Sequence, residues 1–387
     1  MERFDAIVVG AGPAGSTTAY RLASAGARVL LLDRARFPRD KPCGGGLTGR
    51  AVRLLPFTVD PVVEERANRV ELGLGYRRRF ERASAQPLVV LTQRSRLDAF
   101  LAERASAAGA DFRDGVSASD LAADDSGVRL RLEGRLVGAA ALVGADGANG
   151  PVARAFRLGG GIVHGVALEG NLPYGAASRE RFGGRLVLQF GVVPGGYSWI
   201  FPKGDHVNVG VGGWKAEGPR LRAHLERLCA AYDLPPERTE SVRGWRLPMR
   251  TRTTRIAAGR VALVGDAAGL VDPFSGDGMY EAFLSSQFCS DAVLALLAGS
   301  SGTLEPYAER LNASLASLSS ASWRLKYAHD RSPALAFTLV RTPVVWPVIE
   351  AVVRGDLASP SAARGVARGP LRLLRALGRR QASAPES

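Results

Sequence analysis

The stretch Gly10-Ala11-Gly12-Pro13-Ala14-Gly15, directly behind the apolar run Ala6-Ile7-Val8-Val9, decides the fold of this chain. It predicts a GxGxxG turn between a buried strand and a helix over residues 14–25. In this pattern the three glycines permit, in order, a tight turn, close approach of the backbone to a pyrophosphate, and close packing of helix on strand. The start of the helix, at the Pro-Ala pair, offers unpaired N–H groups and a partial positive charge to phosphates.

A second strand is predicted over residues 27–32 and ends at Asp33. An acidic residue at this place accepts hydrogen bonds from ribose hydroxyls. Arg34, the next residue, is a further candidate for ligand contact. The chain is therefore predicted to bind a dinucleotide.

Composition limits the class of protein. The chain has 387 residues, 46% hydrophobic and 23% charged, which is typical of a soluble protein with two domains and a tail. Three cysteines, Cys43, Cys229 and Cys289, suggest neither disulfides nor a metal site and favour a reducing cytoplasm. No signal peptide is expected before the first strand. The apolar stretch 333–353 contains charged residues and prolines, so we expect buried or interfacial helices there.

The net charge of +14 calls for a partner. Nucleic acid is not predicted, because the arginines are dispersed and no nucleic-acid motif is present. Near the end, five arginines at spacings of three or four would share one helix face beside three leucines. These residues are Arg364, Arg368, Arg372, Arg375 and Arg379, with Leu373, Leu374 and Leu377. A solvated helix is the plainer interpretation; the functional one is peripheral contact with the inner face of the membrane.

Two later segments indicate a flavin. Gly265-Asp266 follows a predicted strand over residues 260–264, where a carboxylate can hold a ribityl hydroxyl. The loop Asp272-Pro273-Phe274-Ser275-Gly276-Asp277-Gly278-Met279 then begins a helix to residue 297. Its glycines free N–H groups toward the pyrimidine end of an isoalloxazine, where a positive helix end stabilises an anionic reduced flavin. Asp146-Gly147, behind a strand over residues 139–144, is the third nucleotide element. We therefore predict FAD.

The expected fold class is α/β. Residues 67–91 are predicted as strands, 95–109 as a helix, and 160–250 as short strands punctuated by glycine. The domains follow as a discontinuous Rossmann-like FAD-binding domain (1–65, 92–160 and 250–298), an inserted β-rich substrate domain (66–91 and 161–249), and a helical C-terminal cap with a basic tail (299–387).

These motifs resemble the flavoprotein fold of para-hydroxybenzoate hydroxylase and its relatives over residues 1–295, which implies that Arg94 contacts FAD. Lys41-Pro42-Cys43-Gly44-Gly45-Gly46-Leu47 resembles the cysteine-glycine loop of geranylgeranyl reductases and places Cys43, Gly44 and Gly45 at the cofactor. Residues 194–202 fit the pattern PxxYxWxFP of that family. The resemblance covers nearly the whole chain. It implies saturation of isolated double bonds in prenyl chains by reduced FAD.

Within the matched pattern, Tyr197, Trp199 and Phe201 would share one face of a strand because side chains alternate. Three aromatics there suit a prenylated lipid or prenyl diphosphate, although the same face could simply pack the core. Cys43 and Tyr197 are candidates for positioning or proton delivery, while a small packing residue is the plainer interpretation of Cys43. The four histidines show no triad or metal spacing, and no metal is predicted.

Three points stay open at this stage. Since only one GxGxxG follows a predicted strand and opens a predicted helix, no second Rossmann unit for NADPH is expected, and the electron donor is either NADPH that docks transiently or a ferredoxin. A flavin monooxygenase or halogenase is the alternative enzyme on the same fold. A non-catalytic, membrane-associated flavin-binding protein is the second alternative.

Overall fold

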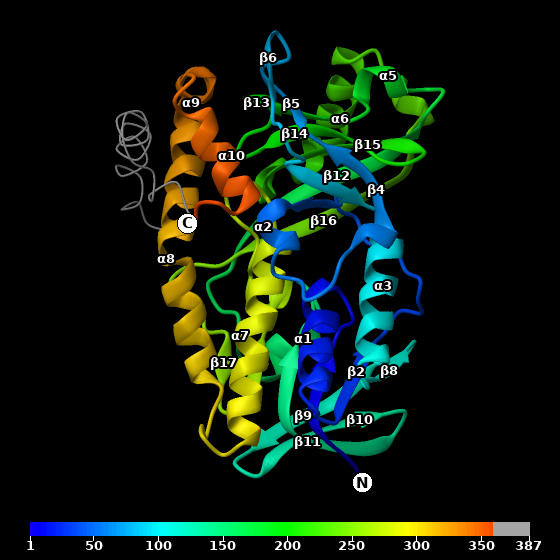
Figure 1. Cartoon of the computed structure of the whole chain (residues 1–387), viewed down its shortest axis with the longest axis vertical. Helices are drawn as coiled ribbons and strands as arrows, with labels where there is room; N and C mark the ends of the chain where they lie inside the picture. The colour runs from blue at the N-terminus through cyan, green and yellow to red at the C-terminus, as the bar shows by residue number, and fades with distance from the viewer. Residues whose placement is uncertain (359–387) are drawn as a thin grey trace.

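The molecule contains two large β-sheets, one at each end of its long axis, and ten helices in the part that the structure describes. The computed structural model describes residues 1–358. The helices are α1 (Pro13–Ser24), α2 (Gly49–Val52), α3 (Arg94–Ala107), α4 (Pro151–Ala155), α5 (Arg179–Phe182), α6 (Leu221–Ala231), α7 (Met279–Leu297), α8 (Glu305–Arg331), α9 (Pro333–Arg341) and α10 (Trp346–Arg354). Helices α1, α3 and α7 lie on the sheet near the N terminus, and α8 runs beside α7 toward the second sheet (Figure 1).

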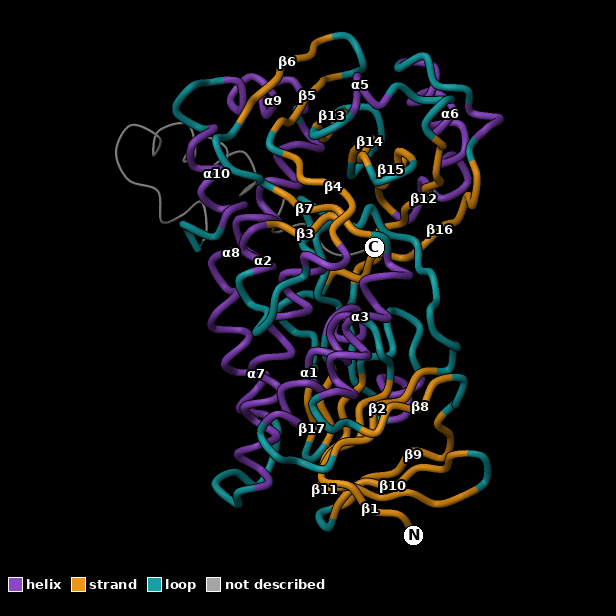
Figure 2. The backbone as a smooth tube through the Cα atoms, turned by 45° about the vertical axis from the view of Figure 1, so that its right-hand side comes forward, coloured by secondary structure: helices purple, strands orange, loops and turns teal. Residues whose placement is uncertain are grey.

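The first sheet has eight strands and is parallel at its centre. Its strands are β1 (Glu2–Val9), β2 (Val29–Asp33), β8 (Asp111–Asp114), β9 (Ala118–Asp124), β10 (Gly127–Leu132), β11 (Arg135–Gly144), β17 (Ala257–Ala258) and β18 (Val261–Leu263). The order is β17-β18-β11-β1-β2-β8, and the antiparallel β9 and β10 extend from β11 (Figure 2).

The register of this sheet brings the three nucleotide motifs together. Val9 at the end of β1 pairs with Gly144 of β11, which in turn pairs with Leu263 of β18. All three strands are parallel, so the turns that follow them leave the same edge of the sheet, which is where α/β sheets bind ligands. The predicted strand–turn–helix order is observed, with α1 beginning at Pro13.

The second sheet has seven strands. They are β5 (Arg69–Leu74), β6 (Arg78–Ala83), β12 (Val163–Pro173), β13 (Arg185–Phe190), β14 (Tyr197–Pro202), β15 (His206–Trp214) and β16 (Glu240–Met249), in the order β16-β12-β15-β14-β13-β5-β6. A small sheet of β3 (Gly46–Thr48), β7 (Val89–Thr92) and β4 (Val63–Ala67) accompanies it. Only β5 and β13 pair in parallel within the second sheet.

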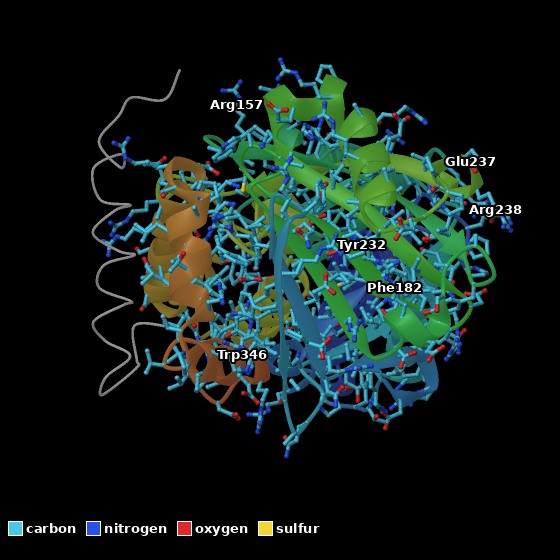
Figure 3. All side chains as sticks on the ribbon, turned by 90° about the horizontal axis from the view of Figure 1, so that it is seen from above. Arg157, Phe182, Tyr232, Glu237, Arg238 and Trp346 are labelled. Carbon is cyan, nitrogen blue, oxygen red and sulfur yellow. The ribbon has the colours of Figure 1, made fainter. Side chains whose placement is uncertain are left out.

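The second sheet differs from expectation in two respects. Strands β12 and β16 are 11 and 10 residues long, rather than short. Helix α6, which covers the sheet, was not predicted. Its buried Leu221, Leu225 and Leu228 have the spacing of one helix face, a signal that would have identified it. Figure 3 shows Phe182 and Tyr232 of this second core, with Trp346 on the separate C-terminal helices.

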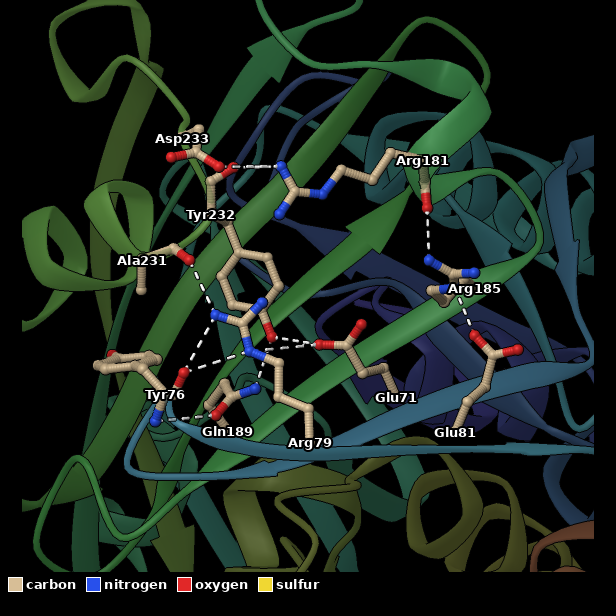
Figure 4. Close-up of polar contacts among 10 residues, drawn as sticks. All are labelled: Glu71, Tyr76, Arg79, Glu81, Arg181, Arg185, Gln189, Ala231, Tyr232 and Asp233. Carbon is tan, nitrogen blue, oxygen red and sulfur yellow. Dashed lines mark hydrogen bonds and ion pairs between the residues drawn. The ribbon is translucent and has the colours of Figure 1, made fainter.

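A polar network ties α6 to the face of the second sheet that carries Glu71 and Gln189 (Figure 4). The Tyr232 hydroxyl donates to Glu71 at 2.6 Å and accepts a hydrogen bond from the Gln189 amide at 2.5 Å. The Arg79 guanidinium lies 4.2 Å from the centre of the Tyr232 ring. Because side chains alternate along a strand, Leu72 and Leu188 face the opposite side, which is left free for a cavity.

The C-terminal helices close that opposite side. Phe337 of α9 and Trp346 of α10 pack in one apolar cluster with Leu72 and Leu186. Among the described helices none is long and apolar enough by itself to cross a membrane, whereas α9 and α10, bent by 88°, pass that test of length and composition as a pair. The predicted basic stripe over residues 364–379 lies outside the described residues.

Candidate active site

One cavity of about 1170 Å³ joins the two sheets. Its walls are the turns behind β1, β11 and β18, the Cys43 loop, the inner face of the second sheet and helices α8 to α10. Every predicted site residue except Gly15 lines it. These residues are Gly10, Gly12, Pro13, Ala14, Asp33, Arg34, Cys43, Gly44, Gly45, Arg94, Asp146, Gly147, Tyr197, Trp199, Phe201, Gly265, Asp266, Gly276, Gly278 and Met279.

The glycine-rich turn is shaped by contacts that admit no side chain. Gly10 has φ +104°, and a Cβ there would lie 2.3 Å from the carbonyl oxygen of Ala145. A Cβ on Gly15 would lie 1.8 Å from the Gly10 oxygen, so Gly15 acts through packing and not by lining the cavity. Gly12 has more room: the nearest atom to its Cβ position is a guanidinium nitrogen of Arg39 at 3.4 Å. The helix start is therefore open to the cavity.

Two acidic residues beside this turn are held by the backbone. Asp33 accepts hydrogen bonds from the amides of Ala11 and Ala35, both at 2.9 Å. Asp146 accepts one from the Val152 amide at 2.8 Å, and its other oxygen is buried without a partner in the described structure. Burial raises the pKa of Asp146 to about 6. An unpartnered buried carboxylate oxygen marks a place where a ligand hydroxyl can donate.

Basic side chains are oriented by carboxylates around the same turn. Buried Arg94 donates two hydrogen bonds of 2.7 Å to Asp98, and Arg39 lies 2.8 Å from the same carboxylate. Asp266 pairs with Lys41 at 2.7 Å between oxygen and Nζ. Burial opposes ionisation of Asp266, but Lys41 outweighs it and lowers the pKa of that carboxyl.

The aromatic wall has the predicted geometry. Ring centres of Tyr197 and Trp199 lie 6.0 Å apart, and those of Trp199 and Phe201 6.2 Å apart. The Trp199 indole donates to the Asn208 side chain at 2.8 Å. Gly210 of β15 lies beneath the ring, since a Cβ there would be 2.1 Å from it. The rings line the cavity and are not buried wholly in a core.

One row of residues across the second sheet changes from charged at one end to apolar at the other, so the lining of the cavity changes in the same direction. Paired residues of neighbouring strands share a face. Reading from β16 to β5, the row is Arg243, Glu169, Gly210, Trp199, Leu188 and Leu72. The apolar end of this row meets α9 and α10. The charged end meets the Cys43 loop, because the Cys43 amide donates to Glu169.

The two candidate proton donors come from different parts of the chain and line the same cavity. Cys43 is half-buried on its loop. The Tyr197 hydroxyl donates to the carbonyl oxygen of Ser275, in the loop that begins α7. Burial raises the pKa of the Tyr197 phenol, so it stays protonated.

Several residues that line the cavity were not predicted from the sequence. His329, for which the sequence predicted no role, is buried, and its ring centre lies 5.3 Å from that of Phe190. Burial lowers the pKa of His329 to about 4. Lys326 donates to the Gly195 carbonyl oxygen at 2.5 Å. Ser322, Lys326 and His329 occupy one face of α8 at spacings of four and three, a pattern that could have revealed them. Glu169 had no such signal.

Comparison with known proteins identifies the family. The FAD binding domain family matches residues 3–161, and the geranylgeranyl reductase catalytic domain family matches residues 183–239. A geranylgeranyl diphosphate reductase of Synechocystis sp. is 32% identical over 314 residues, 74% of each chain. A menaquinone reductase of Mycolicibacterium smegmatis is 34% identical over 298 residues, 72% of this chain and 73% of the relative. The chain belongs to the geranylgeranyl reductase family. It is an FAD-dependent oxidoreductase, as the resemblance implied.

Solved structures share the fold of this geranylgeranyl reductase family member. A geranylgeranyl bacteriochlorophyll reductase-like protein of Thermoplasma acidophilum superposes with TM-score 0.78 at 19% identity, covering 98% of each chain. A flavin-dependent brominase gives TM-score 0.77 at 17% identity, covering 98% of this chain and all of its own. The predicted α/β flavoprotein fold is confirmed. The halogenase likeness is one of fold, whereas the similar sequences quoted above are reductases.

The residues of this oxidoreductase fit FAD. The uncapped start of α1 is open to the cavity and suits a pyrophosphate. Asp33 lines the cavity at the end of β2, where the sequence predicts a ribose contact, and Asp146 has an oxygen free for a further donor. At the start of α7 the amides of Met279 and Tyr280 donate to the Asp277 side chain, at 2.8 and 3.4 Å, so these two are not free for the flavin as predicted.

Proposed function

We propose that this protein saturates isolated C=C bonds in the prenyl chain of an isoprenoid lipid or prenyl diphosphate. The main support is that one continuous cavity begins at the turns behind β1, β11 and β18, which we call the nucleotide cradle. The cavity passes the aromatic wall and ends at the apolar residues of α9 and α10. A long apolar chain needs such a passage, and burying each five-carbon unit contributes about 4 kcal/mol at about 0.8 kcal/mol per carbon.

Reduced FAD, when bound, supplies a hydride. The chain's own residues do the rest. Tyr197, Trp199 and Phe201 hold the prenyl chain flat against the second sheet, while Phe337 and Trp346 exclude water from its far end. An alkene carbon that accepts hydride leaves its neighbour in need of a proton. We assign this task to the Cys43 thiol and the Tyr197 hydroxyl.

The electron donor and the membrane belong to the same proposal. Electrons come from NADPH docked transiently or from a ferredoxin, since only one GxGxxG, that of Gly10 to Gly15, lies between a strand and a helix of a nucleotide-binding unit. A prenyl lipid lies in a bilayer, and the arginines of residues 364–379 would bring the enzyme to an anionic surface. We place the protein in the cytoplasm, in peripheral contact with the inner face of the membrane.

Anaerobic incubation with a panel of prenyl lipids tests the function. The flavin is reduced chemically, so that neither donor is needed, and products are read by mass spectrometry. The expected result is a mass gain of one hydrogen pair for each bond saturated. Consumption of O₂ with oxygen or halogen in the product would favour the monooxygenase or halogenase instead. A flavin that no reductant reduces would favour the non-catalytic alternative.

A further inference from the structure

Two buried ionisable side chains, Glu169 on the second sheet and Lys203 just behind its strand β14, form hydrogen bonds with the backbone of the Cys43 loop, residues 41–47. Glu169 of β12 accepts a hydrogen bond from the Cys43 amide, with 2.5 Å between Oε1 and nitrogen. Lys203, immediately behind β14, donates from Nζ to the carbonyl oxygens of Gly44 and Thr92, both at 2.6 Å. The loop is thus held on either side of Cys43 by residues that are far from it in the chain.

These side chains are nearly removed from water. Lys203 is 2% exposed and Glu169 9% exposed. Burial of such groups is unfavourable unless their hydrogen-bonding capacity is used. Within residues 1–358 neither forms an ion pair, so the bonds that compensate their burial go to the backbone of the loop and to that of Thr92 at the end of β7. Burial lowers the pKa of Lys203 to about 8 and raises the pKa of Glu169, which agrees with this desolvation.

The glycines of the loop show how closely Lys203 and the aromatic wall pack against it. Gly45 has φ +69°, and a Cβ there would lie 2.2 Å from the Lys203 Nζ and 2.0 Å from the Thr92 oxygen. A Cβ on Gly44 would lie 2.9 Å from the ring of Phe201, the last aromatic of the wall. The loop therefore lies flush against both the lysine and the wall, with no space for a side chain at Gly44 or Gly45.

We propose that Glu169 and Lys203 are positioning residues that hold the Cys43 thiol in register with the aromatic wall. Glu169 and the wall belong to the second sheet and Lys203 to the turn that joins its strands β14 and β15, whereas Cys43 belongs to a loop beside the nucleotide cradle. We call the contacts of Glu169 with Cys43 and of Lys203 with Gly44 the clamp. Through the clamp, the second sheet that carries the aromatic wall also fixes the distance from the Cys43 thiol to that wall. Its consequence for alkene reduction rests on the proposed function; its consequence for the thiol does not.

Thiol labelling of the FAD-loaded protein tests the clamp without any substrate. Cys229 and Cys289 are 0% exposed, so a thiol reagent acting on the native protein reports Cys43. Glu169→Ala should release the Cys43 amide and raise the labelling rate at least about tenfold, equivalent to about 1.4 kcal/mol. Glu169→Gln keeps an oxygen acceptor and should stay within about twofold of wild type, a difference of about 0.4 kcal/mol. A Cys43→Ser control should abolish the labelling.

Lys203→Met, of similar length but without donors, should also accelerate labelling. If Lys203→Met does not fold, the two Glu169 variants decide the matter, with thermal melting and FAD affinity confirming that they remain folded. Labelling of Glu169→Ala at the wild-type rate, or of Glu169→Gln as fast as Glu169→Ala, would overturn the proposal. With a prenyl substrate, Glu169→Ala should lower kcat more than it raises KM. Labelling as expected without any prenyl reduction would count against the proposed function and leave the clamp standing.

Discussion

Gly210→Ala should displace the indole of Trp199 while Gly212→Ala, two residues along the same strand, should not. An alanine Cβ at position 210 would lie 2.1 and 2.3 Å from two ring atoms of Trp199. At position 212 the nearest atoms would lie 3.5 and 3.7 Å away, in ordinary van der Waals contact. Both glycines lie on β15 and on the same face, so the pair differs chiefly in that clash.

The cost follows from what the ring must give up. Forcing a methyl group into a packed site costs about 1–3 kcal/mol. Moving the indole also breaks its 2.8 Å hydrogen bond to Asn208, which is 3% exposed. Leaving that buried acceptor unpaired costs about 1–3 kcal/mol more. The sum of about 2–6 kcal/mol corresponds to a fall in Tm of about 4–24 °C at about 2–4 °C per kcal/mol.

Three measurements on the matched pair decide the outcome. Thermal melting should show the fall for Gly210→Ala, and Gly212→Ala should stay near wild type. FAD affinity should be unchanged in both, because the nucleotide cradle lies on other elements. Reduction of a long prenyl chain should drop for Gly210→Ala, since the displaced ring moves into the cavity. Equal melting temperatures and equal activity for the two variants would show that the ring does not rest on Gly210.

Three further predictions concern stability, chain length and the membrane. Burial raises the pKa of Asp146 from 3.8 to about 6, so the stability linked to its protonated form is complete at pH below about 4 and is lost as the pH rises through about 6. Asp146→Asn should therefore raise the apoprotein's free energy of unfolding by up to about 3 kcal/mol at pH 8 but not at pH 4; denaturant melts at both pH values check this, and an equal change at both would contradict it. Val340→Trp should fill the apolar end of the cavity and remove room for one five-carbon unit. Losing the burial of that unit, worth about 4 kcal/mol, should lower kcat/KM on a twenty-carbon chain by up to about a thousandfold and leave a ten-carbon chain unaffected. Equal loss on both chains would place the prenyl tail elsewhere. Ending the chain at Ala363 should reduce co-sedimentation with anionic vesicles, since each arginine near the surface contributes about 1 kcal/mol; undiminished co-sedimentation, with FAD binding intact, would reduce the stripe to a solvated face.

The nucleotide cradle was readable from the sequence because its signals are local. A glycine turn, the strand before it and the helix after it occupy fewer than thirty residues, and their patterns are dictated by backbone sterics and burial. The same holds for Tyr197, Trp199 and Phe201, whose shared face follows from the alternation of a single strand. The lengths of β12 and β16 were not foreseen, because glycine in these stretches hides strand length. Helix α6 was missed for another reason: its three leucines at helical spacing lie between predicted short strands and were not used.

Only the tertiary structure decided which distant residues share the cavity. Glu169 and Cys43 are 126 positions apart, and Lys203 and Gly44 are 159 positions apart. Their contacts depend on the strand order β16-β12-β15-β14-β13, on the pairing register, and on the docking of a loop from one sheet against another. His329 likewise reaches Phe190 only because α8 lies along the sheet. Short-range patterns record which conformation each segment prefers, whereas register and docking are settled by how those segments bury one another, and no single segment carries that information.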